Sequence, residues 1–108
     1  MIDVTVIKSQ GVVTTIDVAG HANMADAGFD IVCASVSVLV INTLNSIEMF
    51  LDDDLTVEAK EGEDNYIHAE FATEQSEGCK LLLDSLMLGL SQITKEYSDY
   101  ISLDTKEV

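Results

Sequence analysis

The sequence predicts an α+β fold, a two-layer sandwich with two helices on one face of a mostly antiparallel sheet. Segments of alternating apolar and polar residues occur in pairs, and two longer segments carry apolar residues at three- and four-residue steps. The length of 108 residues, without proline, suits one domain over residues 1–108 with a single core. The expected order is β-β-α-β-β-α, with a possible final short strand.

The first pair of strands is expected around the turn Ser9-Gln10-Gly11. Ile2 to Lys8 alternates so that Ile2, Val4 and Val6 share one face, and Val12 to Val18 predicts a second strand. The two segments therefore predict an antiparallel hairpin. Gly20 to Phe29, rich in small residues, is interpreted as a loop.

The segment Asp30 to Leu51 predicts a long helix. Its part VSVLVI alone favours a strand, but the whole segment is too long for one strand and continues at helical spacing. Asp30 is then a natural N-cap. The expected core stripe is Ile31, Ala34, Val38, Ile41, Leu44 and Ile47. Because apolar residues surround most of this helix, we expect it to be buried on more than one side.

The second half repeats the pattern after an acidic turn, Asp52 to Asp54. Leu55 to Lys60 and Tyr66 to Ala72 predict a second hairpin, and Glu74 to Tyr97 predicts the clearest helix. Its stripe is Cys79, Leu82, Leu83, Leu86, Leu90, Ile93 and Tyr97. Tyr100 to Leu103 is a candidate short edge strand.

The composition is strongly acidic, with 20 acidic residues against 5 lysines and no arginine, a net charge of −15. Direct nucleic-acid binding is disfavoured because phosphates require clustered basic residues. The charge favours a cationic partner, or serves only solubility. The N-terminus does not resemble a signal peptide, and the apolar run Ile31 to Ile41 is shorter than the ~20 residues of a membrane span. A cytoplasmic protein with free thiols and no membrane contact is expected.

The chemistry concentrates between Gly20 and Ser37, which include His21 and Cys33. A nucleophilic thiol needs a base, and imidazole suits that task near neutral pH. If Asp30 caps the helix, Cys33 lies in the first turn, where unpaired amides favour a thiolate and could bind an oxyanion. Ser37 lies one turn further on the same face, where it could contact the sulfur or a substrate carbonyl.

Each candidate also has a structural interpretation. Cys33 could be a small buried hydrophobe, His21 a surface or capping group, and Asp30 a cap rather than a carboxylate that orients His21. The hydroxyl of Ser37 could bond its own backbone. Cys79 and His68 are interpreted as structural. No cluster of ligands predicts a metal site, no cofactor is expected, and the lack of a C-x-x-C motif disfavours a thioredoxin-like redox protein.

The pattern Gly20-His21-Ala22, then Asp30-Ile31-Val32-Cys33-Ala34 with Gly28 and Ser37, resembles the bacterial ribosomal-processing cysteine proteases known as Prp. The resemblance covers the full chain. It implies that Cys33 is the nucleophile and His21 the general base, that the protein is a homodimer, and that its substrate is the N-terminal extension of a large-subunit ribosomal protein precursor. It also implies that the loop between the two residues orders over bound peptide.

Two expectations remain open on the sequence. The first is a cysteine endopeptidase with a Cys33–His21 dyad. The alternative is a non-catalytic acidic dimer that binds a basic ribosomal protein or assembly intermediate. Independently of the resemblance, the segment Ala22 to Phe29 is expected to be mobile, with Gly20 and Gly28 at its ends, and the surplus apolar surface of the first helix predicts a homodimer.

Overall fold

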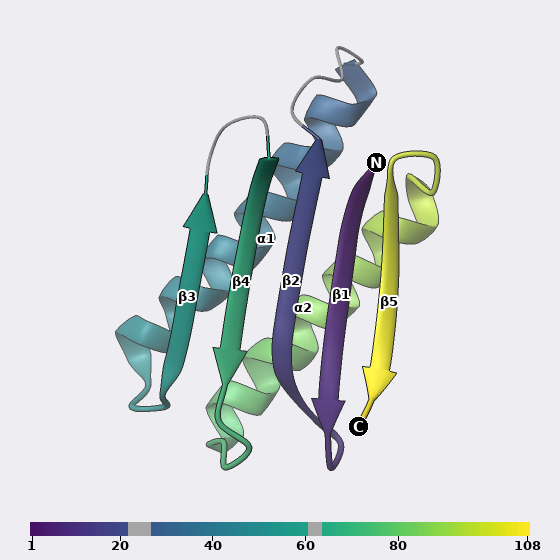
Figure 1. Cartoon of the computed structure of the whole chain (residues 1–108). Coiled ribbons are helices and arrows are strands. Elements are labelled where there is room, and N and C mark those ends of the chain that lie inside the picture. The colour runs from purple at the N-terminus through teal and green to yellow at the C-terminus, as the bar shows by residue number, and fades with distance from the viewer. Residues whose placement is uncertain (22–26, 61–63) are drawn as a thin grey trace.

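The fold is a five-stranded sheet with both helices on one face, as Figure 1 shows for a computed structural model of the chain. Residues 1–21, 27–60 and 64–108 are described. The strands are β1 (Ile2–Ser9), β2 (Val12–His21), β3 (Leu55–Lys60), β4 (Asp64–Phe71) and β5 (Ile101–Glu107), in the spatial order β3-β4-β2-β1-β5. The helices are α1 (Ala27–Phe50) and α2 (Glu77–Glu96). The predicted fold class and element order are confirmed.

The two hairpins form as predicted, and β4 joins them by pairing antiparallel with β2. Ile2, Val4 and Val6 of β1 are buried together, as the alternation indicates. The first hairpin turns at Gln10 and Gly11, with φ of 54° and 81°. Two successive residues with positive φ match the right-handed twist of the strands, and a glycine at the second position relieves the strain.

The final strand is longer than expected and pairs parallel with β1. Its first residue, Ile101, is buried, and the Ile2 amide donates to the Tyr100 carbonyl at 2.8 Å. Ser102 Oγ donates to Asp3 Oδ1 at 2.8 Å on the neighbouring strand. β5 therefore closes the sheet edge that β1 would otherwise leave open.

Helix α1 differs from the prediction in its start and in its core stripe. It already includes Ala27–Phe29, which were interpreted as loop, so Asp30 lies inside its first turn and is not the N-cap. The buried stripe is Val32, Val36, Val40, Leu44 and Ile47. The predicted members Ile31, Val38 and Ile41 are 58%, 68% and 46% exposed, and Ala34 is also exposed. Because apolar residues occupy every side of α1, periodicity alone could not select the side facing the sheet.

Helix α2 follows the prediction closely, but it starts at Glu77 and ends at Glu96, so Tyr97, a predicted member of the stripe, lies after the helix and is 37% exposed. Its buried residues are Cys79, Leu83, Leu86 and Leu90. Two glycines let it approach α1: a Cβ on Gly89 would lie 3.0 Å from Leu39 Cδ1, and one on Gly78 would lie 2.9 Å from Leu51 Cδ2. Leu39 of α1 and Leu51, the residue that follows α1, thus fill hollows at the two glycines, with the helices running antiparallel.

By length and composition, Asp30–Phe50 of α1 could cross a membrane. This apolar segment extends beyond the run Ile31–Ile41 considered from the sequence. A core helix of a soluble protein passes the same test, and the buried stripe of α1 belongs to the same core cluster as β1 and α2. The length of α1 therefore does not indicate a membrane protein.

Candidate active site

The candidate catalytic residues come from two elements, β2 and α1, that approach each other near the C-terminal end of β2. β2 ends at His21, and α1 begins beside that end (Figure 1). The register places the His21 backbone opposite Asp64, and Gly20 opposite Asn65. The fold thus places the backbone of His21 near the start of α1, which then runs back across the sheet toward β3.

Cys33 is partly exposed and packs against the core on one side. On its other side it lines a groove of about 590 Å³, together with Ser37 one helical turn later. Cys33 therefore borders both the core and a space open to a ligand, and its role as a nucleophile stays a prediction.

The expected place of Cys33 in the first turn is wrong. The residue lies six positions after Ala27, the first residue of α1. The amides left unpaired at a helix N-terminus belong to the first turn, whereas the Cys33 amide lies in the helical hydrogen-bonding pattern. The oxyanion donors predicted at Cys33 itself are thus not available from its own backbone amide.

The groove runs between α1 and the half of the sheet formed by β2, β3 and β4. Its α1 wall is one face of the helix, formed by Cys33, Val36, Ser37, Ile41, Leu44, Asn45 and Glu48. The sheet contributes Val18, Gly20, Val57, Ala59, Lys60, Asn65, Tyr66 and Ile67, with Ile2 from β1. An elongated space bordered by one thiol and many apolar side chains suits an extended peptide.

Sequence reasoning missed most of these groove residues. The signal for the helical wall was present, since Ile41 and Asn45 continue the four-residue spacing from Cys33 and Ser37. The opposite wall depends on strand order and register, which place β3 beside β4 and β4 beside β2. A single sequence gives no direct reading of that register.

Several predicted elements of the site fall outside what is described. The segment 22–26 of the expected mobile loop lies outside the described residues, and so does the side chain of His21. Gly28 is helical, in the first turn of α1, and Gly20 belongs to β2. The distance between the His21 imidazole and the Cys33 thiol therefore stays a prediction, as do the hinge at Gly28 and the supporting roles of Asp30 and Ser37.

The second histidine has a partner of its own, as expected for a structural residue. His68 contacts the Asp17 carboxylate through Nδ1, and its Nε2 lies 3.8 Å from Glu70 Oε1. The contact with Asp17 raises the pKa of His68 above its ordinary value. Since Ala69 and Phe71 of the same strand are buried, His68 belongs to the outer face of the sheet, opposite the helices.

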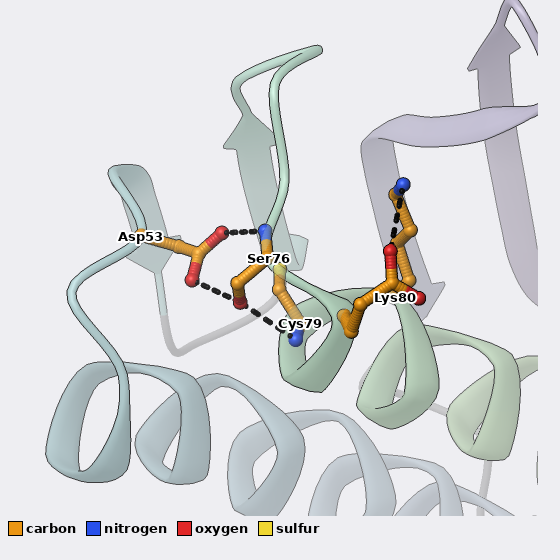
Figure 2. Close-up of polar contacts among 5 residues, drawn as sticks. Asp53, Ser76, Cys79 and Lys80 are labelled. Carbon is orange, nitrogen blue, oxygen red and sulfur yellow. Dashed lines mark hydrogen bonds and ion pairs between the residues drawn. The ribbon is translucent and has the colours of Figure 1, made fainter.

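The second cysteine lies in the N-terminal turn of α2, where it is structural. The Asp53 carboxylate accepts hydrogen bonds from the Ser76 amide at 2.7 Å and the Ser76 hydroxyl at 2.6 Å (Figure 2). Ser76 Oγ in turn accepts from the Cys79 amide at 3.1 Å. Burial, with a contribution from the nearby Asp53 charge, raises the pKa of the Cys79 thiol to about 11. A buried thiol that resists ionisation is a poor nucleophile.

Over the described residues, no group of His, Cys, Asp and Glu side chains is arranged to hold a metal ion.

The profile of the family described as "Cysteine protease Prp" matches residues 1–102. The chain belongs to the Prp family of cysteine proteases. It is similar to the ribosomal processing cysteine protease Prp of Bacillus subtilis, with 28% identity and coverage of 97% of each chain.

Solved structures of the Staphylococcus aureus Prp protease show the same fold. One, in complex with a substrate peptide, has a TM-score of 0.89 and 25% identity, covering 98% of this chain and 100% of that one. Another, with a covalently linked product peptide, has a TM-score of 0.85 and 27% identity with the same coverage. The chain is thus a cysteine protease of a family involved in ribosomal protein processing.

Proposed function

We propose that this protease removes the N-terminal extension of a large-subunit ribosomal protein precursor in the cytoplasm, using a dyad of Cys33 and His21. The observation that carries the proposal is the position of Cys33 on the wall of a peptide-sized groove. The other cysteine, Cys79, is 1% exposed and has a strongly raised pKa. Cys33 is therefore the thiol that a bound peptide can reach.

The reaction proceeds by two acyl transfers. The Cys33 sulfur attacks the scissile carbonyl while His21 takes the thiol proton, and the same proton passes to the leaving amine as the peptide C–N bond breaks. Water, deprotonated by His21, then hydrolyses the thioester and restores the thiol. The relative bound to a covalently linked product peptide supports the covalent step.

The substrate assignment is supported by the relatives named for ribosomal processing and by the charge of the chain. A protein of net charge −15 attracts a precursor rich in lysine and arginine. The alternative of a non-catalytic binding module has no observation of its own in its favour.

The direct test is incubation with the extended ribosomal protein from the same source, followed by intact mass measurement. The expected result is one shortened protein and one released peptide. Cys33→Ala should give neither, and His21→Ala should slow release severely. Full turnover by His21→Ala would contradict the dyad, and an uncut precursor would contradict the substrate.

A homodimer is also proposed, through the outward face of the helical layer. Ile31 and Val38 of α1 and Leu81 and Leu88 of α2 are 58%, 68%, 70% and 61% exposed, each pair spaced by seven residues. Soluble monomers seldom leave a large apolar surface uncovered, and a two-fold axis would bury both copies. Light scattering should give twice the chain mass of 11.7 kDa, and Val38→Glu should reduce the measured mass to that of one chain. A wild-type mass of one chain would contradict the dimer.

A further inference from the structure

The groove changes character along its length. Cys33 and Ser37 lie at the end of the groove near the C-terminal end of β2. Glu48 lines the same groove fifteen residues after Cys33 along α1. At the helical rise of about 1.5 Å per residue, the two positions are roughly 22 Å apart along the axis. Between them the walls are mainly apolar, with Ile41, Leu44 and Val57 among their residues.

Beyond this apolar part the groove meets a second hollow of about 390 Å³. Glu48 and Val57 line both spaces, so the two adjoin at these residues. The second hollow adds the carboxylates of Asp52, Asp53 and Asp54. Asp53 is engaged with Ser76, which leaves the other acidic groups for a ligand.

Glu48 has the features of a binding residue rather than a structural one. It lies seven residues after Ile41, on the same side of α1. Among the described residues it has no ion pair or hydrogen-bond partner from its side chain. A carboxylate without a partner at the end of an apolar groove is complementary to a cationic side chain.

We propose that Glu48 is a specificity-determining residue that binds a lysine or arginine of the substrate at a distance from the scissile bond, with Asp52 and Asp54 reinforcing its charge. An extended peptide advances about 3.3 Å per residue, so the cationic residue lies roughly five to seven positions from the bond that Cys33 attacks. The residues between it and the scissile bond occupy the apolar part of the groove. This inference rests on the proposed peptidase function.

The test uses quenched-fluorescence peptides that carry the cleavage sequence of the precursor with neutral flanks. Each peptide has a single lysine, placed at successive positions on either side of the scissile bond. For the wild type, kcat/KM should peak when the lysine lies about five to seven positions away. Glu48→Gln should lower that peak by about three- to tenfold, mainly through KM, and raised salt should do the same. Glu48→Lys should instead favour a glutamate at that position.

The matched control is Asp84→Asn, which removes one charge from an exposed position of α2 that does not line the groove. It should keep the wild-type preference. If Glu48→Gln and Asp84→Asn behave alike, or if the wild type shows no preference for lysine position, the inference is overturned.

A second measurement separates this inference from the proposed function. Fluorescence anisotropy with Cys33→Ala, alone and combined with Glu48→Gln, reports peptide binding without cleavage. One outcome is that Cys33→Ala binds the lysine peptides, that adding Glu48→Gln weakens this binding, and that the wild type cleaves none of them. This outcome would support the role of Glu48 and contradict the peptidase function. If the wild type cleaves the peptides and binding does not depend on Glu48, the peptidase function is supported and the role of Glu48 is contradicted.

Discussion

The two helices of this protein carry one cysteine each, in opposite settings. Cys79 of α2 lies in an amphipathic helix with its thiol in the core, while Cys33 of α1 lies in a helix with apolar residues on every side and borders an open groove. A helix that is apolar all round has surface left over after covering the sheet. In α1 that surplus forms the wall of the groove and the exposed face, so the helix that departs from simple amphipathicity is the one that carries the proposed nucleophile.

The largest expected difference between the two helices is catalytic. Cys33→Ala should reduce precursor cleavage by at least about a thousandfold, because no other described thiol borders the groove. Cys79→Ala should retain activity and lose only about 1 kcal/mol of unfolding free energy. Mass spectrometry of the cleaved precursor and urea unfolding measure the two effects. Inactivation by Cys79→Ala in a folded protein would reverse the assignment.

Thiol labelling sharpens the same contrast without a substrate. Iodoacetamide should modify Cys33 in the native protein, whereas Cys79, with a pKa of about 11, should react roughly a hundredfold more slowly until the chain unfolds. The single variants Cys33→Ala and Cys79→Ala allow each rate to be followed by intact mass. Equal rates in the folded state would mean that the environments of the two thiols do not differ as described. His21→Ala should slow the labelling of Cys33 near pH 7.

A matched pair of valines tests the two sides of α1. Val36 is 1% exposed and Val38 is 68% exposed, two residues apart in the same helix. Val36→Ala should cost about 2 kcal/mol through lost burial and a cavity, and Val38→Ala at most about 0.5 kcal/mol in a dilute sample. Chemical denaturation measures both. A loss for Val38→Ala that grows with protein concentration would show that the exposed side contacts a second chain.

The smallest effect concerns the start of α2. Hydrogen bonds from Ser76 lower the pKa of Asp53 below its ordinary value of 3.8, so this carboxylate stabilises the fold above that value. The stabilisation is lost as the pH falls through the lowered pKa. Asp53→Asn should therefore reduce the unfolding midpoint at neutral pH and matter less near pH 3. Asp54→Asn, at an exposed neighbouring position, is the control. An equal effect of both substitutions would contradict a stabilising role of the hydrogen bonds between Asp53 and Ser76.

Much of the fold could be predicted because its signals are local. Alternation in β1, the turn at Gln10-Gly11 and the stripe of α2 each lie within one short segment. The stripe predicted for α1 was correct at Leu44 and Ile47 and wrong at its other members, because apolar residues lie on every side of this helix and the sheet that selects between the sides is a tertiary feature. The N-cap assigned to Asp30 failed because the glycine-containing segment before it, interpreted as loop, is already helical at Ala27.

The candidate site divides in the same way. Cys33 and Ser37 could be placed on one helix face from their spacing, and both line the groove. The presence of Tyr66 and Lys60 in the groove wall could not be predicted, because it depends on which strands lie next to each other. Glu48 gave no signal in a chain with 20 acidic residues until its place at the end of the groove distinguished it.

The parallel pairing of β5 with β1 also sets an order of events during synthesis. Ile2 pairs with Ile101, so one side of β1 has no strand to pair with until nearly the whole chain has been synthesised. A nascent chain emerging at about 5–20 residues per second leaves that row of backbone groups uncovered for several seconds. During this interval the open side of β1 is a template for strands of other nascent chains, and the arrival of β5 ends that competition.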